Sequence, residues 1–184
     1  TLMVDTGIFT GRSPKDKYFV VEKTSKNNLW WGDVNQKIEA EIFDELYNNV
    51  LDHYNENNDK PTYIFEGYAG ADENYKLGVR IIAKKAWQYN FCRNMFINQK
   101  KNDSGFSVDF TIINASNFIN EKFKKHGMNS EVFIIFNLEK KMAIIGGTEY
   151  GGEMKKGIFS ILHYYLPLKG VLSMHCSANV DKNF

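Results

Sequence analysis

Apolar residues in this chain occur in short runs, with one longer stretch that repeats at a helical spacing. The members of that stretch are four positions apart: Ile38, Ile42, Leu46, Val50 and Tyr54. This spacing places all five side chains on one face of a helix. The short runs are bounded by polar or glycine-containing segments, as buried strands are. No run approaches the ~20 apolar residues that a membrane-spanning helix needs.

These patterns predict an α/β fold of the mixed α+β type, in which helices flank a mixed sheet. Strand-like segments occur at residues 18–21, 62–66, 79–83, 110–113, 132–136, 142–145 and 171–176. Helical segments are expected at residues 38–54, 86–97, 118–126 and 155–166. The polar segment 137–141 joins two apolar runs and predicts a hairpin. We expect the 86–97 helix to direct its large apolar residues inward: Trp87, Phe91, Met95 and Phe96.

Composition fits a packed domain, because 43% of the 184 residues are hydrophobic and 24% are charged. The formal net charge is +1, so no bulk attraction to nucleic acid or to an anionic membrane is expected. The charges are uneven: residues 76–101 carry seven basic groups and no acid, and residues 39–59 carry seven acids and no Lys or Arg. Two solvated faces explain this distribution. The alternative, a nucleic-acid surface at 76–101, has no binding motif to support it.

The two cysteines, Cys92 and Cys176, are too few for a disulfide framework. We therefore expect reduced thiols and a cytoplasmic location. The chain begins with Thr in a glycine-containing segment and ends at Phe184 soon after a strand-like run. We expect both ends to be cut ends of a longer protein, so the lack of a targeting peptide is uninformative.

The segment 11–17, which reads Gly-Arg-Ser-Pro-Lys-Asp-Lys, is the first of three that carry more than packing residues. Gly11 lets a ligand approach the backbone. Arg12 offers a planar fork for a carboxylate or phosphate, and the lysines add positive charge. Two interpretations remain, an anion-binding loop and an ordinary basic turn.

The second segment, 146–157, places two glycine pairs around Tyr150 and continues into Lys155 and Lys156. Cations in the first turn of a helix oppose the helix dipole, at a cost of ~0.3–1 kcal/mol each. A bound oxyanion would offset that cost and would accept the free N–H groups of the turn. Alternatively, the helix begins later and both lysines are solvated. The segment is not a P-loop, because the chain contains no G-x-x-x-x-G-K-[ST] motif.

The third segment is the strand-like run 173–177. Alternation along a strand puts His175 on the face opposite Met174 and Cys176. His175 is then either a metal ligand or an ordinary hydrogen-bonded histidine, and Cys176 is a packing residue. The other histidines show no ligand partner in the sequence and receive no role: His53, His126 and His163.

Several motifs together resemble those of ATP-dependent phosphoenolpyruvate carboxykinases. Residues 6–17, read as TGIFTGRSPKDK, resemble the family's substrate-loop motif, and residues 147–157 resemble its lysine motif. Further matches follow in the same order along the chain: 30–35, 86–97, 109–115 and 166–180. The resemblance thus covers nearly the whole chain. The Arg-Ser-Pro-Lys-Asp-Lys form is that of the ATP class and not of the GTP class.

The resemblance implies the family's reaction, in which oxaloacetate and ATP give phosphoenolpyruvate, CO2 and ADP during gluconeogenesis. It implies that Arg12 holds the substrate carboxylate and that Tyr150 lies in the pocket for substrate and CO2. Lys156 and His175 would ligate Mn2+ and contribute to the ATP site, with Mg2+ accompanying ATP. Lys155 would stabilise the phosphoryl group or the enolate. A lysine ligates only as the neutral amine, so we expect a lowered pKa for Lys156. No nucleic-acid or membrane partner is expected.

The resemblance also implies a domain organisation. Residues 1–170 would form the N-terminal substrate-binding domain, incomplete at its start. Residues 171–184 would be the first strand of the nucleotide-binding C-terminal domain, cut before the family's P-loop and before the aspartate that completes its metal site. We therefore expect the longer parent protein to be the enzyme and this segment alone to be inactive. The alternative is a non-catalytic truncated paralogue or an anion-binding module.

Overall fold

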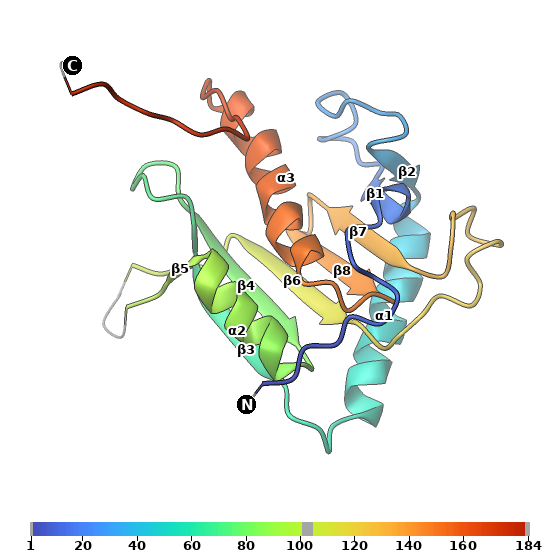
Figure 1. Cartoon of the computed structure of the whole chain (residues 1–184). Coiled ribbons are helices and arrows are strands. Elements are labelled where there is room, and N and C mark those ends of the chain that lie inside the picture. Colours follow the sequence, from blue (N-terminus) through green and yellow to red (C-terminus); the bar gives the residue numbers. More distant parts are fainter. Residues whose placement is uncertain (1, 101–104, 183–184) are drawn as a thin grey trace.

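The computed structural model describes residues 2–100 and 105–182. Within them, eight strands form one mixed sheet in the order β2-β1-β7-β8-β6-β4-β3-β5. The strands are β1 (Lys17–Val20), β2 (Gln36–Ile38), β3 (Tyr63–Ala69), β4 (Leu77–Ala83), β5 (Ile97–Asn98), β6 (Phe110–Ala115), β7 (Phe133–Asn137) and β8 (Met142–Gly146). The helices are α1 (Ala40–Glu56), α2 (Ala86–Met95) and α3 (Gly152–Leu168), with a short 3-10 turn, η1 (Pro14–Asp16), before β1. The predicted α/β class with a mixed sheet is confirmed (Figure 1).

The middle of the sheet is parallel, because β6 lies between β4 and β8 and runs in the same direction as both. The carboxyl ends of these three strands therefore share one edge of the sheet. Since α2 follows β4 and α3 follows β8, both helices begin at that edge. β7 and β8 pair antiparallel with Phe133 opposite Gly146, which confirms the hairpin expected around residues 137–141.

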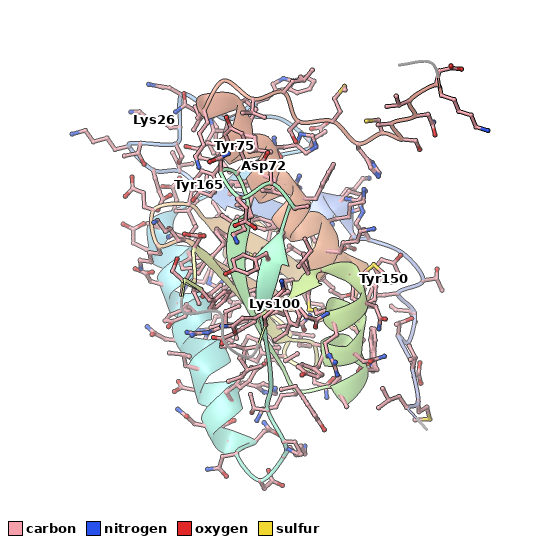
Figure 2. The ribbon with its side chains drawn as sticks, turned by 90° about the vertical axis from the view of Figure 1, so that its left-hand side faces the viewer. Lys26, Asp72, Tyr75, Lys100, Tyr150 and Tyr165 are labelled. Carbon is pink, nitrogen blue, oxygen red and sulfur yellow. The ribbon has the colours of Figure 1, made fainter. Side chains whose placement is uncertain are left out.

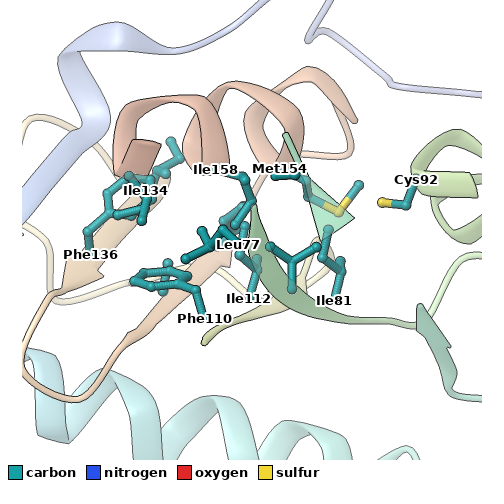
Figure 3. Packing of buried hydrophobic residues seen from close by; sticks show 14 of the residues in the cluster. Leu77, Ile81, Cys92, Phe110, Ile112, Ile134, Phe136, Met154 and Ile158 are labelled. Carbon is teal, nitrogen blue, oxygen red and sulfur yellow. The ribbon is translucent and has the colours of Figure 1, made fainter. Parts of the chain in front are cut away.

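Helices cover both faces of the sheet (Figure 1). One face packs against α1, where Phe43, Leu46 and Val50 are buried. The four-residue repeat is thus a helical stripe, except that its first member, Ile38, lies in β2. The other face packs against α2 and α3 (Figure 3). No helix among the described residues combines the length and the apolar character that crossing a bilayer requires.

A stacked aromatic pair supports α3 on this second face. The rings of Phe19 and Phe136 are stacked with their centroids 4.9 Å apart, and both side chains are buried. A Cβ atom at Gly157 would lie 3.1 Å from Cζ of Phe136. Glycine at this position therefore lets α3 approach the ring closely, and the aromatic pair sets the height of α3 above the sheet.

The expected helix at residues 118–126 is absent, and residues 121–127 form consecutive turns instead. The side chain of Asn120 explains the difference. Its Oδ1 accepts the backbone N–H of Lys122, and its Nδ2 lies 3.1 Å from Nδ1 of His126. An asparagine side chain that bonds nearby groups in this way competes with the hydrogen bonds of a helix.

Helix α2 forms where the sequence predicts it, but its buried residues are Gln88 and Cys92. Met95 is 43% exposed, so the expectation that it faces inward is wrong. Gln88 is tolerated in this position in part because its Nε2 donates to the carbonyl of Glu149. Burial raises the pKa of the Cys92 thiol to about 12.

Residues 171–176 form no strand in the described chain. After α3 the chain turns back beside the helix, where His175 contacts Lys156 and Phe159, and its last residues then extend away from the sheet (Figure 1). The apolar side chains of Leu172 and Met174 are 80% and 62% exposed. A strand needs a neighbouring strand to pair with, and no described strand pairs with these residues.

Phe136→Ala should lower the free energy of unfolding by about 3–5 kcal/mol, because it removes a buried ring and leaves a cavity beneath α3. Urea unfolding followed by far-ultraviolet circular dichroism measures this change. Ile64→Ala is the control, since Ile64 is 53% exposed and its truncation should cost much less. Equal losses in the two variants would contradict the packing described here.

Candidate functional site

The loop at residues 11–17 leads into β1, and a buried carboxylate holds it in place. Asp16 is 4% exposed. Its Oδ1 accepts hydrogen bonds from Nδ2 of Asn129 at 2.9 Å and from the hydroxyl of Ser130 at 2.8 Å. These contacts tie the loop to the turn before β7. Arg12 is exposed near the start of the loop.

Glycines shape the segment that carries Tyr150. Gly147 has a φ of +73°, in the left-handed region that glycine adopts without strain. A Cβ atom at Gly151 would lie 3.0 Å from Cζ3 of Trp87, so glycine lets α2 pack directly against the backbone beside Tyr150. Figure 2 shows Tyr150 on the side of the molecule that carries α2 and the N-terminal segment.

Helix α3 begins at Gly152, three residues before the start expected at Lys155. The interpretation in which the helix starts later is therefore wrong. The first turn contains Glu153, which is 5% exposed, and a carboxylate there interacts favourably with the helix dipole. This carboxylate partly offsets the unfavourable interaction of the two lysines with the helix dipole.

Glu153 also joins α3 to the loop at residues 11–17. Its Oε1 accepts the backbone N–H of Ser13 at 2.6 Å. Burial raises the pKa of Glu153, while the Ser13 hydrogen bond and the positive charge of Arg12 oppose that rise. The carboxylate is therefore desolvated. The hydrogen bond from Ser13 and the charge of Arg12, both in this loop, offset that desolvation.

A first cavity, of about 360 Å³, lies between the N-terminal segment, α2 and the start of α3. Its charged and hydroxyl-bearing side chains include Arg12, Tyr150, Lys155 and Lys156. Its apolar wall includes Val4, Trp87, Phe91 and Met95. Four of the five predicted site residues therefore share one cavity, which has a cationic rim and an aromatic wall.

A second cavity, of about 460 Å³, is lined by Arg12, Lys156 and His175 together with aromatic side chains that include Trp30 and Phe159. The Nζ atom of Lys156 lies 3.1 Å from each ring nitrogen of His175. Because Arg12 and Lys156 line both cavities, the two cavities adjoin. The structure therefore brings all five predicted residues into one region of the surface.

Positive charge is concentrated in this region. Desolvation lowers the pKa of the Lys156 amine, and the neighbouring cations Arg12 and Lys155 lower it further. Burial and Arg12 lower the pKa of Lys17, and Glu153 opposes that effect. Cations that depress one another's pKa repel each other. An anion between them would relieve the repulsion, which favours the anion-binding interpretation of the loop.

The Lys156–His175 pair is chemically suited to a transition metal, because imidazole and neutral amine nitrogens are acceptable ligands for such ions. The lowered pKa of Lys156 favours the neutral amine that ligation needs. Among the described residues, no group of three or more His, Cys, Asp and Glu side chains is placed to hold a metal ion. The pair therefore stands outside any larger cluster of those residue types in this part of the chain.

Sequence reasoning missed two charged members of this region, Glu153 and Lys17. Both stand inside motifs that it singled out, but the spacing of a motif does not show where a side chain points. An acid in the first turn of a helix, just before two lysines, was the available signal for Glu153. Sequence reasoning assigned Trp87 and Phe91 to the core, whereas the structure also uses them as a cavity wall.

Comparison with known proteins adds an independent line of evidence. A family model described as phosphoenolpyruvate carboxykinase matches residues 1–184. The phosphoenolpyruvate carboxykinase (ATP) of Leptospira biflexa is 58% identical over 184 residues, which are 100% of this chain and 34% of that protein. The enzyme of the same name from Campylobacter lari is 51% identical over 183 residues, 99% of this chain and 34% of that protein. The chain thus spans about a third of the length of these curated relatives.

Asp16→Ala should lower the free energy of unfolding by about 2–3 kcal/mol, because it deprives Asn129 and Ser130 of a charged acceptor. For a chain of this size, that corresponds to a melting temperature lower by roughly 5–10 °C, which scanning calorimetry measures. Asp59→Ala removes an exposed carboxylate and should change little. If both variants melt together with the unmodified chain, the Asp16 contacts do not anchor the loop.

Proposed function

The chain belongs to the ATP-dependent phosphoenolpyruvate carboxykinase family, and from that membership we propose that a full-length protein carrying this segment converts oxaloacetate and ATP to phosphoenolpyruvate, CO2 and ADP. The observation that carries the proposal is the convergence of Arg12, Tyr150, Lys155 and Lys156 on one cavity, with His175 at the adjoining one. The reaction has a place in gluconeogenesis. A cytoplasmic setting is part of the proposal, and the free thiols of Cys92 and Cys176 support it.

Arg12 would bind a carboxylate of the keto acid. Its planar fork matches a carboxylate with two parallel hydrogen bonds, which fixes the plane of the substrate before the C–C bond breaks. The contacts of Asp16 and Glu153 hold the loop that carries Arg12. The fork is therefore presented from an anchored backbone rather than from a free turn.

Tyr150 would face the same substrate and the departing CO2. It lines the cavity together with the apolar side chains of Trp87, Phe91 and Met95. An apolar wall suits a nonpolar product and keeps water from the carbon that has just lost its carboxylate. Tyr150 would supply the hydroxyl group on that wall.

Lys155 and Lys156 would stabilise negative charge as it develops on the enolate oxygen and on the transferred phosphoryl group. Both lysines already lie at the cavity next to Arg12, so these two charges are in place before the reaction begins. Such prearranged charges are effective because they need no reorganisation when the transition state forms.

Lys156 and His175 would hold Mn2+, and Mg2+ would enter with ATP. Bound there, Mn2+ would supply a Lewis acid for the reacting oxygen atoms. The chain itself favours the neutral form of the Lys156 amine. Desolvation and the nearby charges of Arg12 and Lys155 lower the pKa of Lys156, which raises the fraction of neutral amine.

Residues 1–170 would form the substrate-binding domain, and residues 171–184 would begin the nucleotide-binding domain. Residues 171–176 form no strand and Leu172 and Met174 are exposed. This supports the division, because such a segment is available to pair with further strands. The parts that bind the nucleotide would then lie in the remaining length of the protein. We propose that the 184-residue chain by itself is inactive.

Lys156→Met in the full-length protein should lower the Mn2+-dependent kcat by at least about 100-fold, as expected when one prearranged electrostatic contact is lost. Lys125→Met is the matched control, because Lys125 is exposed and lies in the turn segment away from both cavities. Circular dichroism of both variants checks that the fold is intact. An unchanged Mn2+-dependent rate for Lys156→Met would remove this residue from the site.

The isolated 184-residue chain should bind Mn2+ only weakly and should show no carboxykinase turnover, because two nitrogen donors without a carboxylate form an incomplete site. Isothermal titration with MnCl2 and a coupled phosphoenolpyruvate assay measure the two quantities. His175→Asn should abolish the weak binding. Nanomolar affinity or measurable turnover in the unmodified chain would contradict the division of labour proposed here.

A further inference from the structure

A single buried carboxylate connects the two segments that carry the predicted site residues. Glu153 lies in the first turn of α3, three residues before Lys156 on the same helix. Its Oε1 accepts the backbone N–H of Ser13, the residue directly after Arg12. Among the described residues, this is the only hydrogen bond that joins the loop at residues 11–17 to α3. It therefore sets the distance between the Arg12 backbone and the lysine-bearing helix.

The surroundings of Glu153 show that the contact is more than packing. Its charge attracts Arg12 and Lys17 and is repelled by Asp16. Arg12 and Lys17 repel each other, and Arg12 also acts on Lys156. Glu153 is therefore the counter-charge that lets Arg12 stay near Lys17 and the lysine-bearing helix.

We propose that Glu153 is a positioning residue that fixes the Arg12 loop against α3 and thereby sets where the guanidinium group meets a substrate carboxylate. The part of the proposal that concerns the position of the loop stands on the geometry alone. The part that concerns oxaloacetate rests on the proposed carboxykinase function. Glu153 itself lines neither of the two cavities described above, so it acts through Arg12.

The effect of the Glu153 charge on the stability of the fold distinguishes a positioning role from a stabilising one. Burial raises the pKa of Glu153, which means that the folded chain binds a proton at this group more tightly than the unfolded chain does. Such a group makes its full contribution to the free energy of unfolding at low pH. That contribution is lost as the pH rises from the pKa of the unfolded chain through that of the folded chain. At neutral pH the charge on Glu153 thus costs stability, and its neutral analogue, Gln, should not destabilise the fold.

The first test is hydrogen exchange of backbone amides in the 184-residue chain. In Glu153→Ala, exchange of the Ser13 amide should accelerate by at least about tenfold, because a hydrogen bond to a charged acceptor is lost. Glu153→Gln keeps an acceptor oxygen, and its effect on the Ser13 amide should be smaller.

Glu139→Ala is the matched control for this test. Glu139 also accepts a backbone N–H from a distant residue, Thr24, and its side chain lines neither cavity. Its substitution should affect the Thr24 amide and leave the Ser13 amide unchanged. Slow exchange of the Ser13 amide in Glu153→Ala would overturn the proposal.

The second test is steady-state kinetics of Glu153→Gln in the full-length protein. Gln keeps the acceptor for Ser13 but removes the negative charge that attracts Arg12. The KM for oxaloacetate should therefore rise by about tenfold, because the contact of Arg12 with the substrate is weakened in the ground state and the transition state alike. The KM for ATP should stay within about twofold, and the melting temperature should not fall. An unchanged KM for oxaloacetate overturns the proposal, as does a parallel rise of both KM values with a lower melting temperature.

The two tests separate this proposal from the proposed function. If the unmodified full-length protein has no carboxykinase activity, the proposed function fails. The exchange of the Ser13 amide then decides the positioning role by itself. If the activity is present and the Ser13 amide is indifferent to Glu153→Ala, the function stands and the positioning role is refuted.

Discussion

Mutual repulsion among cations is the constraint on which this site depends. Arg12, Lys17, Lys155 and Lys156 come from two distant parts of the chain. Among residues 2–100 and 105–182, the only carboxylate that joins these parts by a hydrogen bond is that of Glu153. Burial raises the pKa of that carboxylate, so its charge is maintained at a cost. Charges of one sign gather in this way only where the fold imposes their positions, because the side chains by themselves would separate.

The sheet determines the positions of these charged segments. The loop with Arg12 leads directly into β1, and α3 follows β8 across a short connection. β1 and β8 both pair with β7, so the two charged segments rise from neighbouring parts of one sheet. The stack of Phe19 on Phe136 then determines how closely α3 lies above it, since Gly157 leaves no side chain between helix and ring. Packing in the core therefore holds the cations of the site together against their mutual repulsion.

Much of this fold follows from local patterns, and the exceptions have identifiable physical causes. The hairpin of β7 and β8 and the helix that buries Leu46 and Val50 were predicted, because alternating or periodic burial is written directly in the sequence. The helix at 118–126 was wrong because the Asn120 side chain offers the backbone other partners. The strand at 171–176 was also wrong for this chain, because pairing depends on a neighbour that a local pattern does not reveal.

For the site, too, the sequence indicates which residue types take part but not how they are arranged in space. A fork-shaped cation in a glycine-containing loop and two lysines near a helix start suggested an anion site from their chemistry alone. No sequence pattern indicates that Arg12 and Lys156 line both cavities. An anion bound in the first cavity and a metal ion held at the second would therefore share side chains, and charge placed in either cavity would act on the same two groups. The coupling between the two cavities lies in their common wall and follows from the tertiary fold.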